Sequence, residues 1–275
     1  GATTPGPNAV SMGYQTGSNT AGSRSVNIGV RAGNTNAGTS SVNIGDRAGD
    51  RSGIDSVNIG KQTGANSGQD SVNVGDQAGV NSGNQSVNIG FGANSKGNQG
   101  VHIGGGSGYT NAGLSSTGVG AFTGQSNQGQ GAVALGFTAG SANQGPAALA
   151  IGNGAGYSNQ GNFAVAIGTG AGSNNQPDNS IIISADGAIL DSALENSLTI
   201  SPIREITEAT NTNFALIHDS ITKEVTRVSR ENFLATIPSS GNSGIGRVFE
   251  FKGFTNAAPG PGEIAILGND IKMHQ

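Results

Sequence analysis

The sequence has no cysteine, no tryptophan and few charged side chains, with only 11% of its 275 residues being Asp, Glu, Lys or Arg. The absence of cysteine excludes a disulfide framework and any metal site with thiolate ligands. No apolar run approaches the roughly 18 residues of a membrane-spanning helix, so we expect no membrane span. The net charge of −4 is too small, and the apolar residues too regularly spaced, for an intrinsically disordered chain.

The few charges are unevenly distributed, since none occurs between Gly97 and Pro177. A nucleic-acid-binding protein needs a stripe of Lys and Arg to neutralise phosphates, and the sequence has none. Aspartate and glutamate are too sparse and scattered in the repeats for the paired carboxylates of a polysaccharide-cleaving enzyme. We therefore predict a protein that is not an enzyme, needs no cofactor and binds no nucleic acid.

Glycine, in contrast, is abundant, with 49 residues, and much of it marks a short repeat. Each repeat reads Val-x-Ile-Gly, two variable residues, Ala-Gly and then a polar stretch with one more glycine. A unit of about 14–16 residues cannot bury a core alone, so neighbouring units must stack into a solenoid. We predict an all-β fold, a β-roll or β-helix. The first glycine of the phrase recurs at Gly13, Gly29, Gly45, Gly60, Gly75, Gly90, Gly104, Gly120, Gly136, Gly152 and Gly168, with Ser184 in the last such place.

The residues from Ser41 to Ser56 illustrate one coil. Ser-Val-Asn-Ile alternates polar and apolar residues, which predicts a short strand with Val42 and Ile44 on one face. We expect this face to point into the coil, with Ala48 as a second, smaller inward residue. The predicted core is therefore Val26, Ile28, Val42, Ile44, Val57, Ile59, Val72, Val74, Val87, Ile89, Val133, Leu135, Leu149, Ile151, Val165 and Ile167.

The residue between the two apolar ones then points outward. Its row changes from Asn to Ala along the chain, and both residue types suit a subunit interface, Asn through stacked amides and Ala through close packing. A core of one Val, one Ile and one Ala per coil is thin, which also favours burial against other chains. We predict a homotrimer whose interface row is Asn27, Asn43, Asn58, Asn73, Asn88, His102, Ala134, Ala150 and Ala166.

The repeats resemble a known family. Val165-Ala166-Ile167-Gly168 and Leu149-Ala150-Ile151-Gly152 are similar to the head repeats of trimeric autotransporter adhesins. The resemblance covers about residues 10–184 and implies a trimeric, left-handed β-roll. The present coils are longer, and the first half has Asn in place of Ala, so the handedness stays open.

The rest of the chain lacks the repeat. We expect a linker over residues 1–9, the solenoid shaft over 10–184, a β-rich connector with a hairpin over 185–237, a flexible linker over 238–246 and a truncated further β module over 247–275. The connector should hold a strand at 197–201, a hairpin of 214–218 with 225–228, and a helical turn at 230–234. The last module should hold strands at 247–254 and 263–267.

Two segments of the connector, 196–206 and 214–226, are similar to segments of fibre proteins from bacteriophages and large viruses, where they follow a repetitive shaft. This resemblance implies a structural virion fibre, a phage tail or collar fibre that supports host attachment. Its partners would be two further copies of itself, other virion proteins and a host-surface glycan or protein. The alternative is the head of a trimeric adhesin on a bacterial cell surface.

Few side chains suggest a site. His102 lies in the predicted interface row, so a trimer would gather three copies at its axis as a metal or anion site; the alternative is an imidazole that simply fills one coil. The aromatic residues of the uncharged half either seal gaps between subunits or stack on sugar rings at exposed corners. These residues are Tyr109, Phe122, Phe137, Tyr157 and Phe163.

Overall fold

The computed structural model describes residues 6–203, 214–218, 225–229, 264–267 and 270–273. The chain divides into two compact units, residues 1–203 and 204–275. In the described residues every regular element is a β-strand, which confirms the predicted all-β class.

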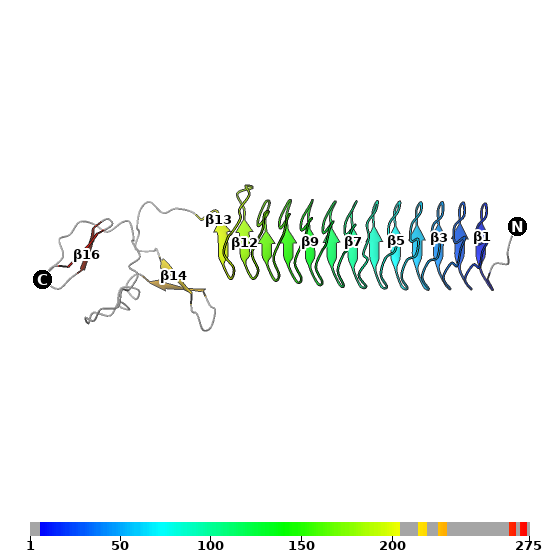
Figure 1. Ribbon diagram of the computed structural model, residues 1–275, viewed down its shortest axis with the longest axis horizontal. Coiled ribbons are helices and arrows are strands. Elements are labelled where there is room, and N and C mark those ends of the chain that lie inside the picture. Colours follow the sequence, from blue (N-terminus) through cyan, green and yellow to red (C-terminus); the bar gives the residue numbers. More distant parts are fainter. Residues whose placement is uncertain (1–5, 204–213, 219–224, 230–263, 268–269, 274–275) are drawn as a thin grey trace. The chain divides into compact units, whose positions relative to one another are not determined.

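The first unit is a β-solenoid in which each coil contributes one short strand to a 13-stranded parallel sheet (Figure 1). Strand order in the sheet follows the chain without any crossover, so each coil pairs only with the coils before and after it. The strands are β1 (Val10–Met12), β2 (Val26–Ile28), β3 (Val42–Ile44), β4 (Val57–Ile59), β5 (Val72–Val74), β6 (Val87–Ile89), β7 (Val101–Ile103), β8 (Thr117–Val119), β9 (Val133–Leu135), β10 (Leu149–Ile151), β11 (Val165–Ile167), β12 (Ile181–Ser184) and β13 (Leu198–Ser201).

The repeat phrase sets the register between coils. Val42, Asn43 and Ile44 pair with Val57, Asn58 and Ile59, so equivalent residues stack directly on one another. Strands β1 to β11 are each followed directly by an anchor glycine, which turns the chain. Gly45 has φ +136°, and a Cβ atom there would overlap the carbonyl oxygen of Gly60 in the next coil. Only glycine therefore fits this corner.

The sheet continues past the predicted shaft boundary at residue 184. Strand β13 pairs in parallel with β12, from Ile181 opposite Leu198 to Ser184 opposite Ser201. The predicted strand at 197–201 thus exists, but it belongs to the solenoid. Asp186 helps to close this end, because its carboxylate accepts hydrogen bonds from the hydroxyls of Ser184 and Ser201.

Two antiparallel pairs lie in the second unit. Strands β14 (Phe214–His218) and β15 (Val225–Ser229) form the predicted hairpin pair, and β16 (Ile264–Leu267) pairs with β17 (Asp270–Met273). The predicted helical turn at 230–234, the linker at 238–246 and the strand at 247–254 lie outside the described residues.

The two faces of the solenoid strands are the reverse of the prediction. The middle residue of each strand points into the coil, and the flanking Val and Ile point outward and stay partly exposed; in β2, Asn27 is buried while Val26 and Ile28 are half-buried. The predicted alternation is confirmed, but the polar residue is the buried one, because a hydrogen-bond ladder between coils satisfies its polar groups. Ala48, predicted to point inward, is fully buried.

This correction applies to both predicted rows. None of the predicted core residues is buried in the chain: Val26, Ile28, Val42, Ile44, Val57, Ile59, Val72, Val74, Val87, Ile89, Val133, Leu135, Leu149, Ile151, Val165 and Ile167. All of the predicted interface residues have no exposed surface: Asn27, Asn43, Asn58, Asn73, Asn88, His102, Ala134, Ala150 and Ala166. The coil interior is too narrow for two branched apolar side chains and takes one side chain from each strand.

Candidate functional site

The interior of the first coils is a ladder of asparagine amides. Asn58 donates from Nδ2 to Oδ1 of Asn43 at 2.8 Å, and Asn73 donates in the same way to Asn58 at 2.9 Å. The second amide hydrogen goes to a serine two residues earlier, such as Ser56, whose hydroxyl in turn donates to the carbonyl of Gly53. The ladder runs from Asn27 to Asn88, and from Asn43 onward both amide hydrogens of each asparagine are used, so these buried amides carry no desolvation penalty for missing acceptors.

In the later coils the side chain that fills the interior comes from outside the strand, on the opposite side of the coil. Their strands carry Gly118, Ala134, Ala150 and Ala166, and the long amide comes from the returning segment of the coil. Gln144 Nε2 donates to the carbonyl of Val133 at 2.9 Å, and Gln160 Nε2 donates to that of Leu149 at 2.9 Å. Every such glutamine is 2% exposed: Gln128, Gln144, Gln160 and Gln176. Each of these coils therefore still contains one buried amide side chain, which comes from an asparagine of the strand in the early coils and from a glutamine outside the strand in the later ones.

His102 lies where the two arrangements meet. It pairs with Asn88 on one side and Gly118 on the other, and it has no exposed surface. Its ring nitrogens lie 3.2 Å from the hydroxyls of Ser107 and Ser116. Burial removes the ring from water and lowers the pKa of His102 to about 4, so the imidazole is neutral at pH 7.

The predicted axial site at His102 is therefore wrong. A side chain enclosed in its own coil cannot meet the equivalent residues of other chains at a shared axis. The other prediction for this residue, an imidazole that fills one coil with hydrogen bonds, agrees with the geometry. In the part of the chain that the structure describes, no three His, Asp or Glu side chains are grouped to hold a metal ion.

The outward face of the solenoid sheet is a continuous apolar surface. We call it the strand face, and it consists of the first and third residues of β2 to β11. These side chains are half-buried by their neighbours in the chain, with Ile59 38% exposed and Ile89 37% exposed. Valine, isoleucine and leucine repeat at these positions with little interruption for the length of the sheet, which is unusual for a surface that faces only water.

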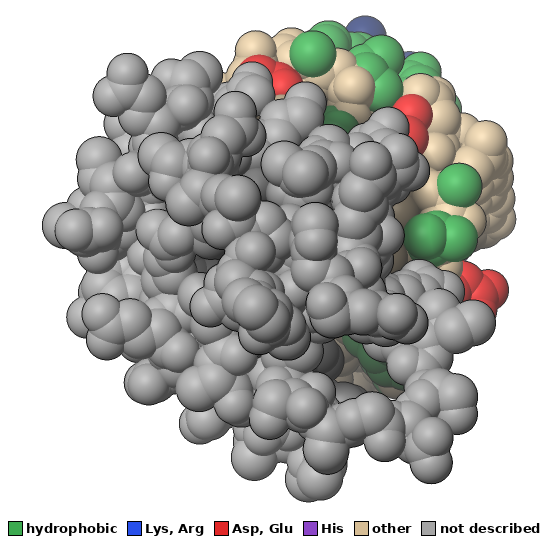
Figure 2. Space-filling model, turned by 90° about the vertical axis from the view of Figure 1, so that its left-hand side faces the viewer, with side chains coloured by type: hydrophobic (Ala, Val, Ile, Leu, Met, Phe, Trp, Pro, Cys, Tyr) green, Lys and Arg blue, Asp and Glu red, His purple; other side chains and the backbone are tan. Residues whose placement is uncertain are grey.

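Figure 2 gives a second view of the surface, turned by 90° from Figure 1. Where the described part is visible, it is made mostly of hydrophobic side chains and uncharged polar or backbone atoms, with few charges. The predicted aromatic residues are all exposed, from 43% at Phe122 to 64% at Phe163. Phe122 and Phe137 contact each other edge to face, with ring centroids 6.1 Å apart. Tyr109 lies in an earlier coil, and Tyr157 and Phe163 both lie in the coil between Gly152 and Gly168.

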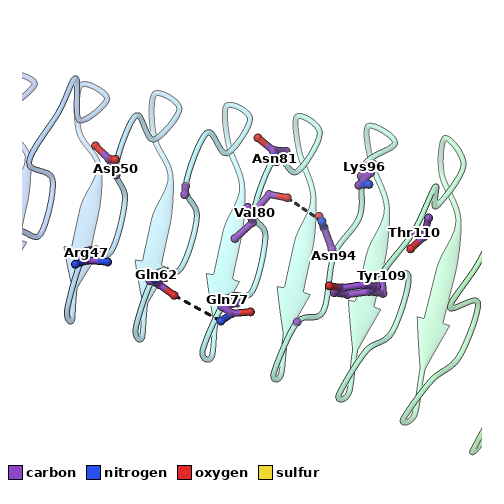
Figure 3. Close-up of a pocket in the computed structure, with 12 residues that line it drawn as sticks. Arg47, Asp50, Gln62, Gln77, Val80, Asn81, Asn94, Lys96, Tyr109 and Thr110 are labelled. Atoms are coloured by element: carbon purple, nitrogen blue, oxygen red, sulfur yellow. Dashed lines mark hydrogen bonds between the residues drawn. The ribbon is translucent and has the colours of Figure 1, made fainter.

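A groove on the flank of the solenoid was not anticipated from the sequence. It has a volume of about 490 Å³ and crosses five coils, from Arg47 and Asp50 to Tyr109 and Thr110 (Figure 3). Its lining comes from the returning segments of the coils and includes no strand residue. The one signal in the sequence is the distance from Gly90 to Gly104, which is shorter than any other interval between anchor glycines.

No family model matches the chain, and neither a curated protein nor a solved structure resembles it significantly. Among the described residues there is no helix with the length and apolar character needed to cross a membrane.

Proposed function

We propose that the chain forms a homotrimeric structural shaft whose strand faces pack around a common axis. The observation that carries the proposal is the strand face, an apolar surface that extends over ten consecutive strands and is only half covered in one chain. Covering it removes apolar area from water in every coil. The interface that we infer is therefore made of the valine and isoleucine rows, and the asparagine and alanine rows lie inside each chain.

The geometry of the sheet favours a cyclic arrangement of parallel chains. Equivalent residues of successive coils stack in register, as Leu149, Val165 and Ile181 do. Chains related by a rotation about the long axis keep each coil level with its copies, so the apolar layers meet layer by layer. Each chain has one such face, and three faces directed inward enclose an apolar axis. The resemblance to the head repeats of trimeric adhesins also supports three subunits.

The biological role that we propose is a virion fibre, a phage tail or collar fibre that supports host attachment. It rests on the similarity of segments 196–206 and 214–226 to viral fibre proteins. The role is structural and non-enzymatic, and its partners are the copies of the chain, other virion proteins and a host-surface molecule. The adhesin head of a bacterial cell surface is the second candidate, favoured by Leu-Ala-Ile-Gly at residues 149–152 and Val-Ala-Ile-Gly at residues 165–168.

The mass of the purified chain in solution tests the trimer. Light scattering coupled to size exclusion should give three times the 27.0 kDa of one chain. A mass of one chain at micromolar concentration would contradict the proposal. For the role, antibodies against the chain should label purified virus particles; labelling confined to the bacterial envelope would instead support the adhesin.

A further inference from the structure

The groove on the flank exists because one coil is short. Asn94 occupies the place that Gly79 and Gly108 hold in the neighbouring coils, as its backbone N–H donates to Ser107 while that of Gly79 donates to Ala93. From Gly79 the next corner, Gly83, follows after three residues, whereas from Asn94 the corner Gly97 follows after two. This segment of the solenoid therefore has one residue fewer here than in the preceding coil, and two fewer than in the following coil, where four residues separate Gly108 from Gly113.

Two residues of the short coil, Asn94 and Gly92, leave the groove open. Asn94 turns inward and donates from Nδ2 to the carbonyl of Val80 at 2.7 Å, which ties the short coil to its neighbour. Gly92 takes the position that Gln62 and Gln77 hold in preceding coils and contributes no side chain. A Cβ atom on Gly92 would lie 3.6 Å from two ring atoms of Tyr109, so the tyrosine ring borders the empty space directly.

The groove combines one aromatic wall with several hydrogen-bonding groups. Tyr109 is 55% exposed and closes one end. Gln62 and Gln77 lie along the groove and are joined to each other at 3.5 Å (Figure 3). Lys96 lines the wall nearby. At the opposite end Asp50 is half-buried, and its Oδ1 has no donor within the described part of the chain.

We propose that this groove binds an extended oligosaccharide. An aromatic face packs against the apolar C–H face of a sugar ring, while amides and carboxylates pair with its hydroxyls, which both donate and accept. A concave site with a few convergent polar groups and an aromatic wall is the usual form of a small-ligand site. Five stacked coils span roughly 19 Å, room for several sugar units.

Other ligand classes fit the groove less well. A polyanion would meet the carboxylate of Asp50 beside only two cations, Arg47 and Lys96. A peptide strand would need free backbone groups for sheet pairing, but the coil backbones here are bonded to each other, as Gln77 is to Lys61 and Asn81 to Ala65. A neutral sugar chain needs neither a cluster of cations nor free backbone groups. The site goes beyond the shaft role, which requires no ligand on the flank.

The experiment compares binding of the full chain and four variants to an array of defined oligosaccharides, with neutral hexose, N-acetylhexosamine, uronate and sulfated members. Tyr109→Ala removes the aromatic wall. Gly92→Gln fills the groove, and the backbone tolerates it because Gln62 and Gln77 hold φ of 54° and 59° where Gly92 has 62°. The matched controls are Tyr157→Ala, another exposed tyrosine, and Gly154→Gln, at φ +65° with open space around it.

The expected result is that at least one oligosaccharide binds the unaltered chain and both controls. Calorimetric titration with that ligand should show affinity at least tenfold weaker for Tyr109→Ala and for Gly92→Gln. Circular dichroism and solution mass, measured on every sample, separate a loss of the site from a loss of the fold or of the trimer. The proposal is overturned if no oligosaccharide binds at millimolar concentration, if the groove variants bind as well as the controls, or if only peptides bind.

Discussion

Gly49 stands directly against Asn43, because a Cβ atom on this glycine would overlap the Asn43 amide oxygen inside the coil. The same relationship joins Gly64 to Asn58 and Gly140 to Gln144. The Ala-Gly pair of each repeat therefore makes room for the amide that fills the coil. A positive φ at Gly49 is a second reason for glycine at this place.

Replacing Gly49 by Ala should destabilise the solenoid for both reasons. Gly154→Ala is the matched control, since Gly154 has φ +65° beside the +66° of Gly49 but has no atom within 4 Å of the added Cβ. We expect the control to cost roughly 1 kcal/mol from backbone strain. Gly49→Ala should cost roughly 1–3 kcal/mol more from overpacking, measured as the free energy of unfolding in denaturant. Equal costs would contradict the role of Asn43.

Replacing Asn58 by Asp tests the direction of the ladder. The new carboxylate can still accept from Asn73 Nδ2 but cannot donate to Asn43 Oδ1, and it carries a buried charge. We expect a loss of about 3–5 kcal/mol at pH 7. Burial raises the pKa of such a carboxyl in the folded chain, so stability should fall as pH rises above about 4, the value for an unfolded Asp.

The control for this variant is Asn66→Asp. Asn66 donates to Asn81 in a ladder of the same kind on the exposed surface. Water screens the new charge there, so the change should stay below about 1 kcal/mol. If the two variants show the same stability and the same pH dependence, the Asn58 amide is not enclosed as described.

The sequence was sufficient to predict the solenoid and its register, but not the orientation of the strands. The anchor glycines and the period specify where each coil begins. A period of two only says that Val42 and Ile44 share a face, and Asn43 the other. Which face is inside depends on whether a buried amide finds partners, and those partners, Ser41 and the asparagine of the adjacent coil, are assembled only by stacking.

The groove could not be predicted from the sequence for a related reason. It is produced by one absent residue and by the missing side chain of Gly92, and neither forms a motif. The sequence analysis also did not predict that the amide filling the coil comes from the strand in early coils, as at Asn73, and from the segment outside the strand in later coils, as at Gln144. The signal for this change was present, because glutamine appears in the return segment in the coils where the strand residue becomes Gly or Ala.

Charge introduced on the strand face should separate the subunits without unfolding the coils. Ile59 and Ile89 point outward, so the double variant Ile59→Glu/Ile89→Glu would place carboxylates in two layers of the proposed interface. Burying unpaired like charges is costly, so the solution mass should fall to that of one chain while the circular dichroism is kept. The control, Val30→Glu/Phe91→Glu, changes residues just after anchor glycines. A trimer that persists in the first variant would contradict the proposed interface.

Acid should weaken the solenoid through His102. The pKa of this residue is lowered by burial from 6.5 to about 4 in the folded chain. The unfolded chain therefore binds a proton at a higher pH than the folded one, and stability falls as pH drops from about 6.5 towards 4. A shift of this size corresponds to a loss of roughly 3 kcal/mol over that interval.

His102→Asn isolates this effect, because Asn continues the ladder from Asn88 and does not titrate. His218 and His274 are present in both proteins, so their contributions cancel in the difference. We expect the stability of the unaltered chain relative to His102→Asn to decline by roughly 3 kcal/mol between pH 7 and pH 4 in denaturant titrations at constant ionic strength. A constant difference across this range would mean that His102 is reached by water or protonated in the fold. That outcome would mean that the coil containing His102, where the asparagine ladder gives way to the glutamines, is more open to water than the structure shows.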